Sequence, residues 1–124
     1  MEQKKVLIID DDARNIFALK AVLRSRGIPC IAASTGAEGL ALLDGGHEVG
    51  VVLMDIMMPD MDGYETIAAL RAKEGEEHLP IIAVTAKAMV GDREKCLEAG
   101  ADDYISKPVD VDVLLSQLQQ YLSV

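Results

Sequence analysis

The chain has 124 residues, the size of one ordinary domain, and can bury a hydrophobic core without disulfides or structural zinc. Its 12 basic and 21 acidic residues give a net charge of −9, which argues against a surface that binds nucleic acid or anionic membranes. No apolar run is long enough for a secretion signal or a membrane span, so we expect a cytoplasmic protein without membrane insertion.

Five apolar runs, several of them rich in β-branched residues, alternate along the chain with five segments of helical periodicity. This alternation predicts an α/β fold in which helices cover both faces of a parallel sheet. We predict a single domain over residues 1–124, with a core of about 4–122 and no output domain attached. The predicted strands span residues 5–10, 29–33, 49–55, 80–85 and 102–106.

The segments between these runs carry signals for the start and end of helices. The first helix is predicted to end before Gly27 and Pro29, and the second to begin at a capping box formed by Thr35 and Glu38. The later helices are predicted to follow Gly63, to span about 88–99 with Gly100 at the C′ position, and to begin at Asp110 as N-cap.

The cysteines and histidines are not predicted to form a site. Cys30 and Cys96 lack the spacing of metal ligands and sit in apolar contexts, so we interpret them as small buried hydrophobic residues in a reducing compartment. His47 and His78 fall in predicted loops and are expected to be exposed. A phosphate-donating histidine would need a helical bundle, which this pattern does not predict.

Acidic residues follow two of the predicted strands. Asp10, Asp11 and Asp12 come directly after the first, and Asp55 ends the third. Because ligands bind at the carboxyl ends of the strands in open α/β sheets, we expect these side chains to lie together at that edge. Carboxylates that lie this close together either raise one another's pKa or bind a cation. The pattern therefore predicts a site for a hard divalent metal ion.

Two later strands lead into further polar residues. Thr85 and Ala86 follow the fourth apolar run, and Lys107 and Pro108 follow the fifth. Strand ends that are far apart in the sequence converge at one edge of the sheet, so this edge is predicted to hold Thr85 and Lys107 beside the carboxylates.

These residues, in this order and at these intervals, resemble the receiver domains of two-component response regulators over roughly residues 4–122. The stretches 11–15 and 54–65 are also very similar to the receiver domains of hybrid histidine kinases. The resemblance implies a flavodoxin-like (βα)5 fold, a doubly wound sheet of five parallel strands in the order 2-1-3-4-5.

The resemblance also implies a reaction and a metal ion. Asp55 would accept a phosphoryl group from the phosphohistidine of a histidine kinase or of a histidine phosphotransfer domain. Asp10, Asp11, Asp55 and the backbone carbonyl of Met57 are the implied ligands of Mg²⁺, with Mn²⁺ as a substitute. For Asp12 two roles remain open, metal binding through water and capping of the first helix.

The remaining site residues receive their roles from the same resemblance. Lys107 would pair with Asp55 before phosphorylation and with the phosphoryl oxygens afterwards, and a cis bond to Pro108 would aim its ammonium inward. Thr85 would donate its hydroxyl to a phosphoryl oxygen, and Ala86 would leave room beside it.

Tyr104 matches the switch aromatic of the family. Movement of Thr85 toward the phosphoryl group would let the ring turn inward, remodelling the surface of the fourth helix, fifth strand and fifth helix and thereby controlling partner binding or onward phosphotransfer. If the phosphoryl group is passed on, the resemblance implies that the first helix would be the docking face. The domain would catalyse its own phosphorylation and slow autodephosphorylation without turning over a small-molecule substrate. The oligomeric state is not predicted.

Other functions fit the residues less well. An aspartyl-phosphate hydrolase needs a second acid two residues after the nucleophile, where Met57 stands. A flavin or dinucleotide carrier needs a glycine-rich turn after the first strand, where three aspartates stand. A scaffold or pseudo-receiver that acts without phosphorylation is the alternative, although all five site positions are present. Within the family, a free-standing regulator and a receiver of a hybrid kinase both stay open.

Overall fold

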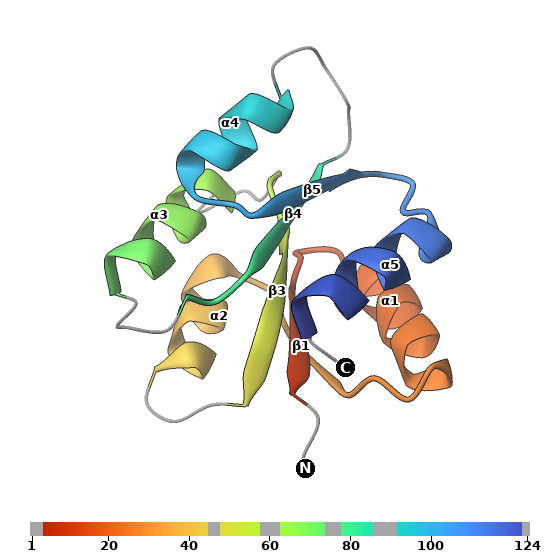
Figure 1. The fold of residues 1–124 in the computed structure, drawn as a ribbon. Helices are drawn as coiled ribbons and strands as arrows, with labels where there is room; N and C mark the ends of the chain where they lie inside the picture. Colours follow the sequence, from red (N-terminus) through yellow and green to blue (C-terminus); the bar gives the residue numbers. More distant parts are fainter. Residues whose placement is uncertain (1–3, 45–47, 58–62, 74–77, 86–91, 123–124) are drawn as a thin grey trace.

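The computed structural model describes residues 4–44, 48–57, 63–73, 78–85 and 92–122. Within these residues, five parallel strands form one sheet in the order β2-β1-β3-β4-β5, with helices on both faces (Figure 1). This is the predicted doubly wound order. The elements are β1 (Lys5–Ile9), α1 (Ala13–Ser25), β2 (Cys30–Ala33), α2 (Gly36–Leu43), β3 (Val49–Asp55), α3 (Gly63–Lys73), β4 (Ile81–Thr85), α4 (Asp92–Ala99), β5 (Asp103–Ser106) and α5 (Val111–Leu122).

The strands agree with their predicted ranges to within one residue at every end. β3 shows the physical reason, because its residues Val51, Val52, Leu53 and Met54 are at most 1% exposed. A strand that is covered by helices on both faces needs apolar side chains at successive positions rather than at alternate ones. An uninterrupted apolar run therefore marks a central strand, and β3 lies between β1 and β4.

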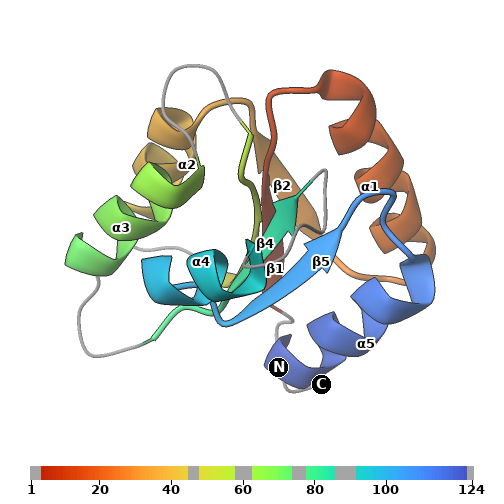
Figure 2. The same ribbon diagram turned by 90° about the horizontal axis from the view of Figure 1, so that it is seen from above.

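Two hydrophobic cores lie on opposite faces of the sheet. Leu23 of α1 packs with Leu114 and Leu118 of α5 on one face. Ile67 of α3 and Cys96 of α4 belong to the core on the other face, which α2 also covers. Figure 2 shows these two helical layers from above, with the sheet between them. None of the helices in the described residues is both long and apolar enough to cross a membrane.

Glycines end α1 and α4, as predicted. Gly27 and Gly100 have backbone φ values of +73° and +120°, in the region that favours glycine. After α1, the N–H of Ile28 donates to the Leu23 carbonyl at 2.9 Å and the Gly27 N–H donates to the Arg24 carbonyl at 3.0 Å. This pair of bonds is a Schellman motif, which satisfies carbonyls that the last helical turn leaves free.

The predicted N-caps of α2 and α5 are also confirmed. The Glu38 N–H donates to Thr35 Oγ1 at 3.0 Å, and the Asp112 N–H donates to Asp110 Oδ1 at 2.9 Å. The Glu38 carboxylate accepts from the N–H of Ser34, one residue earlier than in the usual capping box. The predicted start of the fourth helix, near residue 88, lies outside the described residues.

The edge opposite the acidic residues contains an ion-pair network that the sequence did not predict. Asp102 Oδ2 accepts from Arg71 Nη2 and from the Ile81 N–H, both at 2.8 Å. Its Oδ1 lies 2.6 Å from His78 Nε2. His78 is exposed, as predicted, but it has this acidic partner. Arg71 also donates to the Gly100 carbonyl, so the network joins α3, the end of α4 and the starts of β4 and β5.

Of the two cysteines, only Cys96 has the predicted burial. It is fully buried, whereas Cys30 is half-buried because β2 is an edge strand of the sheet. Neither cysteine forms a disulfide. The interpretation of Cys96 as a small core hydrophobe is confirmed, and that of Cys30 holds only in part.

Candidate functional site

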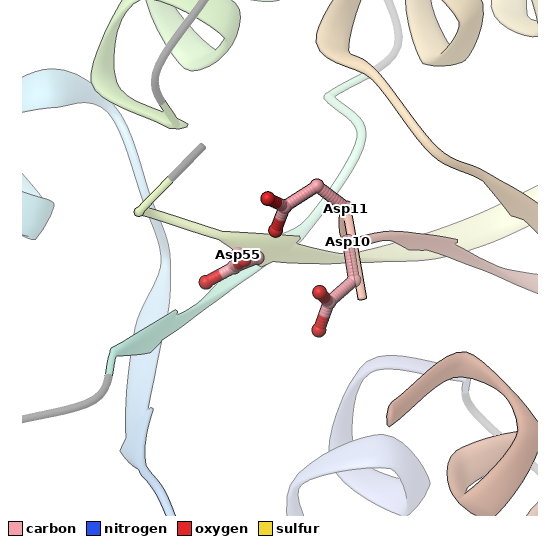
Figure 3. A group of neighbouring side chains, drawn as sticks. All are labelled: Asp10, Asp11 and Asp55. Atoms are coloured by element: carbon pink, nitrogen blue, oxygen red, sulfur yellow. The ribbon is translucent and has the colours of Figure 1, made fainter. Parts of the chain in front are cut away.

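Three carboxylates converge at the carboxyl edge of the two central strands. Asp10 and Asp11 follow β1, and Asp55 is the last residue of the neighbouring β3 (Figure 3). One oxygen from each carboxylate lies within 4.8 Å of the others. Parallel pairing of β1 with β3 brings these residues together, as the sequence pattern predicts.

Asp10 is held in place by the loop that follows it. Only 3% of the residue is exposed. Its Oδ1 accepts from the Asp12 N–H at 2.8 Å, and its Oδ2 accepts from Asn15 Nδ2 at 3.4 Å. Sequence reasoning did not assign Asn15 a role at this site. Its position five residues after Asp10, in the first turn of the following helix, is the signal that could have found it.

Asp55 is equally buried but accepts fewer hydrogen bonds from the described residues. It is 3% exposed, and its Oδ1 accepts a long hydrogen bond of 3.3 Å from the Met57 N–H. Met57 itself is 69% exposed, so its side chain does not cover the carboxylate. The resulting arrangement is a buried carboxylate at a strand end beside the exposed residue Met57, which suits a group that must react with an incoming molecule.

Lys107 provides the positive charge of the site. Its Nζ lies 3.5 Å from Asp55 Oδ1 and 3.6 Å from Asp10 Oδ2, so it bridges the two buried carboxylates. The backbone N–H of Lys107 donates to the Thr85 carbonyl at 2.7 Å, which ties the residue to the end of β4. The peptide bond to Pro108 is cis, the form that the family resemblance implies. The predicted convergence of the strand ends is therefore confirmed.

The electrostatics of the cluster favour protonation of Asp55 or binding of a cation. Burial raises the pKa of Asp55 from its ordinary value of 3.8 to about 6, and the Asp10 carboxylate adds to this effect. Lys107 and the Met57 N–H act in the opposite direction, while Asp11 raises the pKa further. Among the described residues, one ammonium stands against three carboxylates, which leaves excess negative charge in this cluster. Clustered carboxylate oxygens with one exposed member are the ligands that Mg²⁺ prefers.

This raised pKa predicts that Asp55→Asn stabilises the protein at neutral pH. A group whose pKa is higher in the folded state contributes stability below its unfolded pKa and loses it as the pH rises through the folded pKa. Without divalent cations, wild-type stability should therefore fall between pH 3.8 and about 6 relative to the variant. We expect Asp55→Asn to be more stable by about 1–2 kcal/mol at neutral pH, because solvent at the open rim screens part of the effect.

Urea denaturation of both proteins across this pH range measures the difference. The same curves on Asp102→Ala serve as a control, because Asp102 is an acid with Arg71 as its partner. Its removal should destabilise the protein at neutral pH. A wild type that is as stable as Asp55→Asn at every pH would contradict the assigned effect of burial on Asp55.

Asp12 belongs to α1 rather than to the carboxylate cluster. Its Oδ1 accepts from the Arg14 N–H at 2.9 Å and makes it the N-cap of the helix. Hydrogen bonds from the Arg14 side chain and N–H lower the pKa of the Asp12 carboxyl. Of the two roles that the sequence left open, the structure therefore places Asp12 in the capping one.

Tyr104 lies on β5, away from the carboxylates. It is half-buried and packs against the core formed with α3 and α4. Its carbonyl accepts from Gln117 Nε2 of α5 at 3.1 Å. Thr85, at the end of the adjacent β4, is buried at the same edge as Asp55. Ala86 lies outside the described residues.

Comparisons with known proteins agree with this geometry. A family model, the response regulator receiver domain, matches residues 6–119. A hybrid signal transduction histidine kinase I of Dictyostelium discoideum is 38% identical over 98% of the chain, which covers 8% of that protein. The polar-differentiation response regulator DivK of Brucella ovis is 35% identical, with 96% of each protein covered. The chain thus spans a small part of some relatives and nearly all of others.

Solved structures show the same similarity. The receiver domain of the sensor histidine kinase PA1611 of Pseudomonas aeruginosa, which has a magnesium ion coordinated in its active-site cleft, has a TM-score of 0.85 and 33% identity, with 99% of this chain and 100% of that chain covered. The receiver domain of Saccharomyces cerevisiae Ssk1, solved with the histidine phosphotransfer protein Ypd1, has a TM-score of 0.86 and 26% identity, with 99% and 92% covered. The solved structures share the fold described above. The family model and the relatives show that the chain belongs to the response regulator receiver domain family of two-component systems.

Proposed function

We propose that this domain, with a core of about residues 4–122, accepts a phosphoryl group on Asp55 from a phosphohistidine. A carboxylate oxygen of Asp55 would form the new bond to phosphorus as the bond from phosphorus to the histidine nitrogen breaks, and the nitrogen keeps the electron pair. The observation that carries this proposal is the buried Asp55 carboxylate beside one ammonium and two further carboxylates.

The proposal includes a divalent metal ion at the acidic cluster. Asp10, Asp11, Asp55 and the backbone carbonyl of Met57 would hold Mg²⁺, with Mn²⁺ as a substitute, and their oxygen atoms suit a hard cation. Bound there, the ion supplies positive charge against the phosphoryl oxygens. The raised pKa of Asp55 supports this assignment, because uncompensated carboxylates favour any added positive charge.

Two further side chains would contact the phosphoryl group. Lys107 would exchange its pairing with Asp55 for the phosphoryl oxygens, and its present distance of 3.5 Å supports that role. The Thr85 hydroxyl would donate to one of them from the end of β4. Ala86, outside the described residues, and Pro108 would support these positions.

Phosphorylation would then be read out through Tyr104. As Thr85 moves toward the phosphoryl group, the Tyr104 ring would turn further inward and change the surface of α4, β5 and α5. The half-buried position of Tyr104 against the core near α3 and α4 supports this proposal, because a small displacement could bury or expose the ring. The changed surface would control partner binding or onward transfer.

The partner would be a histidine kinase or a histidine phosphotransfer domain, as for the Ssk1 receiver that was solved with Ypd1. We place its docking face on α1, where Phe17 is 76% exposed close to the start of the helix. An exposed aromatic residue is a typical interface anchor. Asn15, on the same helix, contacts Asp10 of the site. The net charge of −9 supports the accompanying inference that the domain binds no nucleic acid. A cytoplasmic location is part of the same proposal.

A phosphotransfer assay with Phe17→Ala tests this function. Label from a phosphorylated histidine phosphotransfer domain should reach the variant at least about tenfold more slowly than the wild type, because the interface loses an aromatic anchor. Phosphorylation by acetyl phosphate should be unchanged. Leu42→Ala is the matched control, since Leu42 is exposed on α2, on the other face of the sheet. Equal transfer to wild type and Phe17→Ala would contradict docking on α1.

A further inference from the structure

A cavity of about 260 Å³ lies directly under the carboxylates, between the sheet, α1 and the segment that leads into α5. Its walls are aliphatic. Leu19 and Val22 of α1 face it from one side, and Val109, Val111 and Leu114 from the other. Small-molecule sites in proteins combine such apolar walls with a few convergent polar groups.

The polar groups of this cavity all lie at one end. Asp10, Asn15, Asp55 and Lys107 line the same space as the aliphatic residues. Lys107 bridges Asp10 and Asp55 at 3.6 and 3.5 Å. Within the part of the chain that the structure describes, two carboxylates therefore share one ammonium, and the polar end has an excess of negative charge. The cavity is thus amphipathic, with an anionic end and an aliphatic end.

Part of the aliphatic wall is only partly covered by the protein. Leu19 and Val109 pack against the core on this face of the sheet and are still half-buried rather than buried. Ala18, which is exposed, lines the cavity with the smallest side chain of the α1 wall. Covering apolar surface that is otherwise in contact with water lowers the free energy of the complex.

We propose that this cavity binds small primary alkylammonium compounds, with the ammonium at Asp10 and Asp55 and the alkyl chain between α1 and the start of α5. The positive charge of the head group follows from the excess carboxylate charge, which repels anions and attracts cations. The length of the alkyl chain follows from the volume of the cavity, which holds about nine non-hydrogen atoms at roughly 30 Å³ each. A metal ion alone would use only the polar end.

Such a ligand would regulate the site above it. It would occupy Asp10 and Asp55, two of the residues that we assign to Mg²⁺, so the amine and the metal ion would compete. This regulatory consequence rests on the proposed function, whereas binding of the amine does not. A domain that takes up the amine and never becomes phosphorylated would uphold the binding site and reject the proposed function.

Titration of ¹⁵N-labelled protein with n-hexylammonium chloride, followed by amide chemical shifts, tests the binding site. Saturable shifts are expected for residues around the cavity, including Asn15, Val22 and Val109. 1-Hexanol and hexanoate should each bind at least about tenfold more weakly, because they lack the charge that pairs with the carboxylates. Hexanol binding as tightly as the amine would overturn the head-group assignment, and no saturable shift with the amine would overturn the proposal.

A pair of variants on α1 locates the alkyl chain. Ala18→Leu places a larger side chain at the cavity wall and should weaken amine binding at least about tenfold. Ala21→Leu makes the same change at an exposed position of the same helix that does not line the cavity, and should bind like the wild type. Both variants should still be phosphorylated by acetyl phosphate. Equal amine binding by the two variants would contradict this location.

Discussion

Saturating Mg²⁺ is expected to raise the unfolding temperature of the wild type at neutral pH, and Asp11→Asn is expected to remove most of that rise. The cluster exists only when β1 and β3 are paired, so a ligand of the cluster stabilises the folded state alone. The free energy of unfolding rises by about 2.7 kcal/mol when the Mg²⁺ concentration is about one hundred times its Kd. Loss of one of the proposed carboxylate ligands should weaken Mg²⁺ binding at least about 100-fold, since loss of outer-shell partners already costs about 10–100-fold.

Asp12→Asn is the matched control for Asp11→Asn. Asp12 is the next residue in the chain, but its carboxylate caps α1 and asparagine can replace it in that role. Mg²⁺ affinity, measured by calorimetry and by thermal unfolding, should therefore be close to that of the wild type. Equal affinity for wild type and Asp11→Asn, or equal losses in the two variants, would contradict the assignment of the metal ligands.

Gly63→Ala is expected to destabilise the protein by at least about 3 kcal/mol, the upper end of the usual cost of overpacking a core. A Cβ at this position would lie 2.6 Å from the Asp55 carbonyl oxygen and 2.6 Å from Ile56 Cα. Both are backbone atoms, so no side-chain rotation can relieve the contact. The Gly63 N–H also donates to the Ile56 carbonyl at 2.9 Å, which holds the start of α3 against the residue after Asp55.

Urea denaturation measures this effect, with Gly27→Ala as the control. Gly27 has a positive φ, but a Cβ added there would meet no atom within 4 Å, so its substitution tests backbone strain without a clash. It should cost about 1–2 kcal/mol. If Gly63→Ala cost no more than Gly27→Ala, close packing would not be the reason for glycine at position 63.

The strands and the site edge could be predicted because their signals are local. β3 is an uninterrupted apolar run that ends in Asp55, and β4 ends in Thr85 in the same way. In a parallel sheet such ends meet at one edge whichever helices intervene, so the convergence of Asp55 with Asp10 and Lys107 follows from the order of the elements.

Features that depend on packing could not be predicted in this way. Asp102 meets Arg71 and His78, which are 31 and 24 residues away, and nothing in the local pattern pairs them. Asp12 could be a metal ligand or a cap because both roles use a carboxylate, and only the position of α1 distinguishes them. The half-burial of Cys30 likewise depends on the place of β2 at the sheet edge.

The measurement that tests the central claim most directly is the intact mass after incubation with acetyl phosphate, with and without Mg²⁺, for wild type and Asp55→Asn. A gain of one phosphoryl group in the wild type that requires Mg²⁺ and is absent from Asp55→Asn is the predicted result. The same gain in Asp55→Asn, or no gain in the wild type under any condition, would contradict the role of Asp55. The latter result would favour a scaffold that acts without phosphorylation.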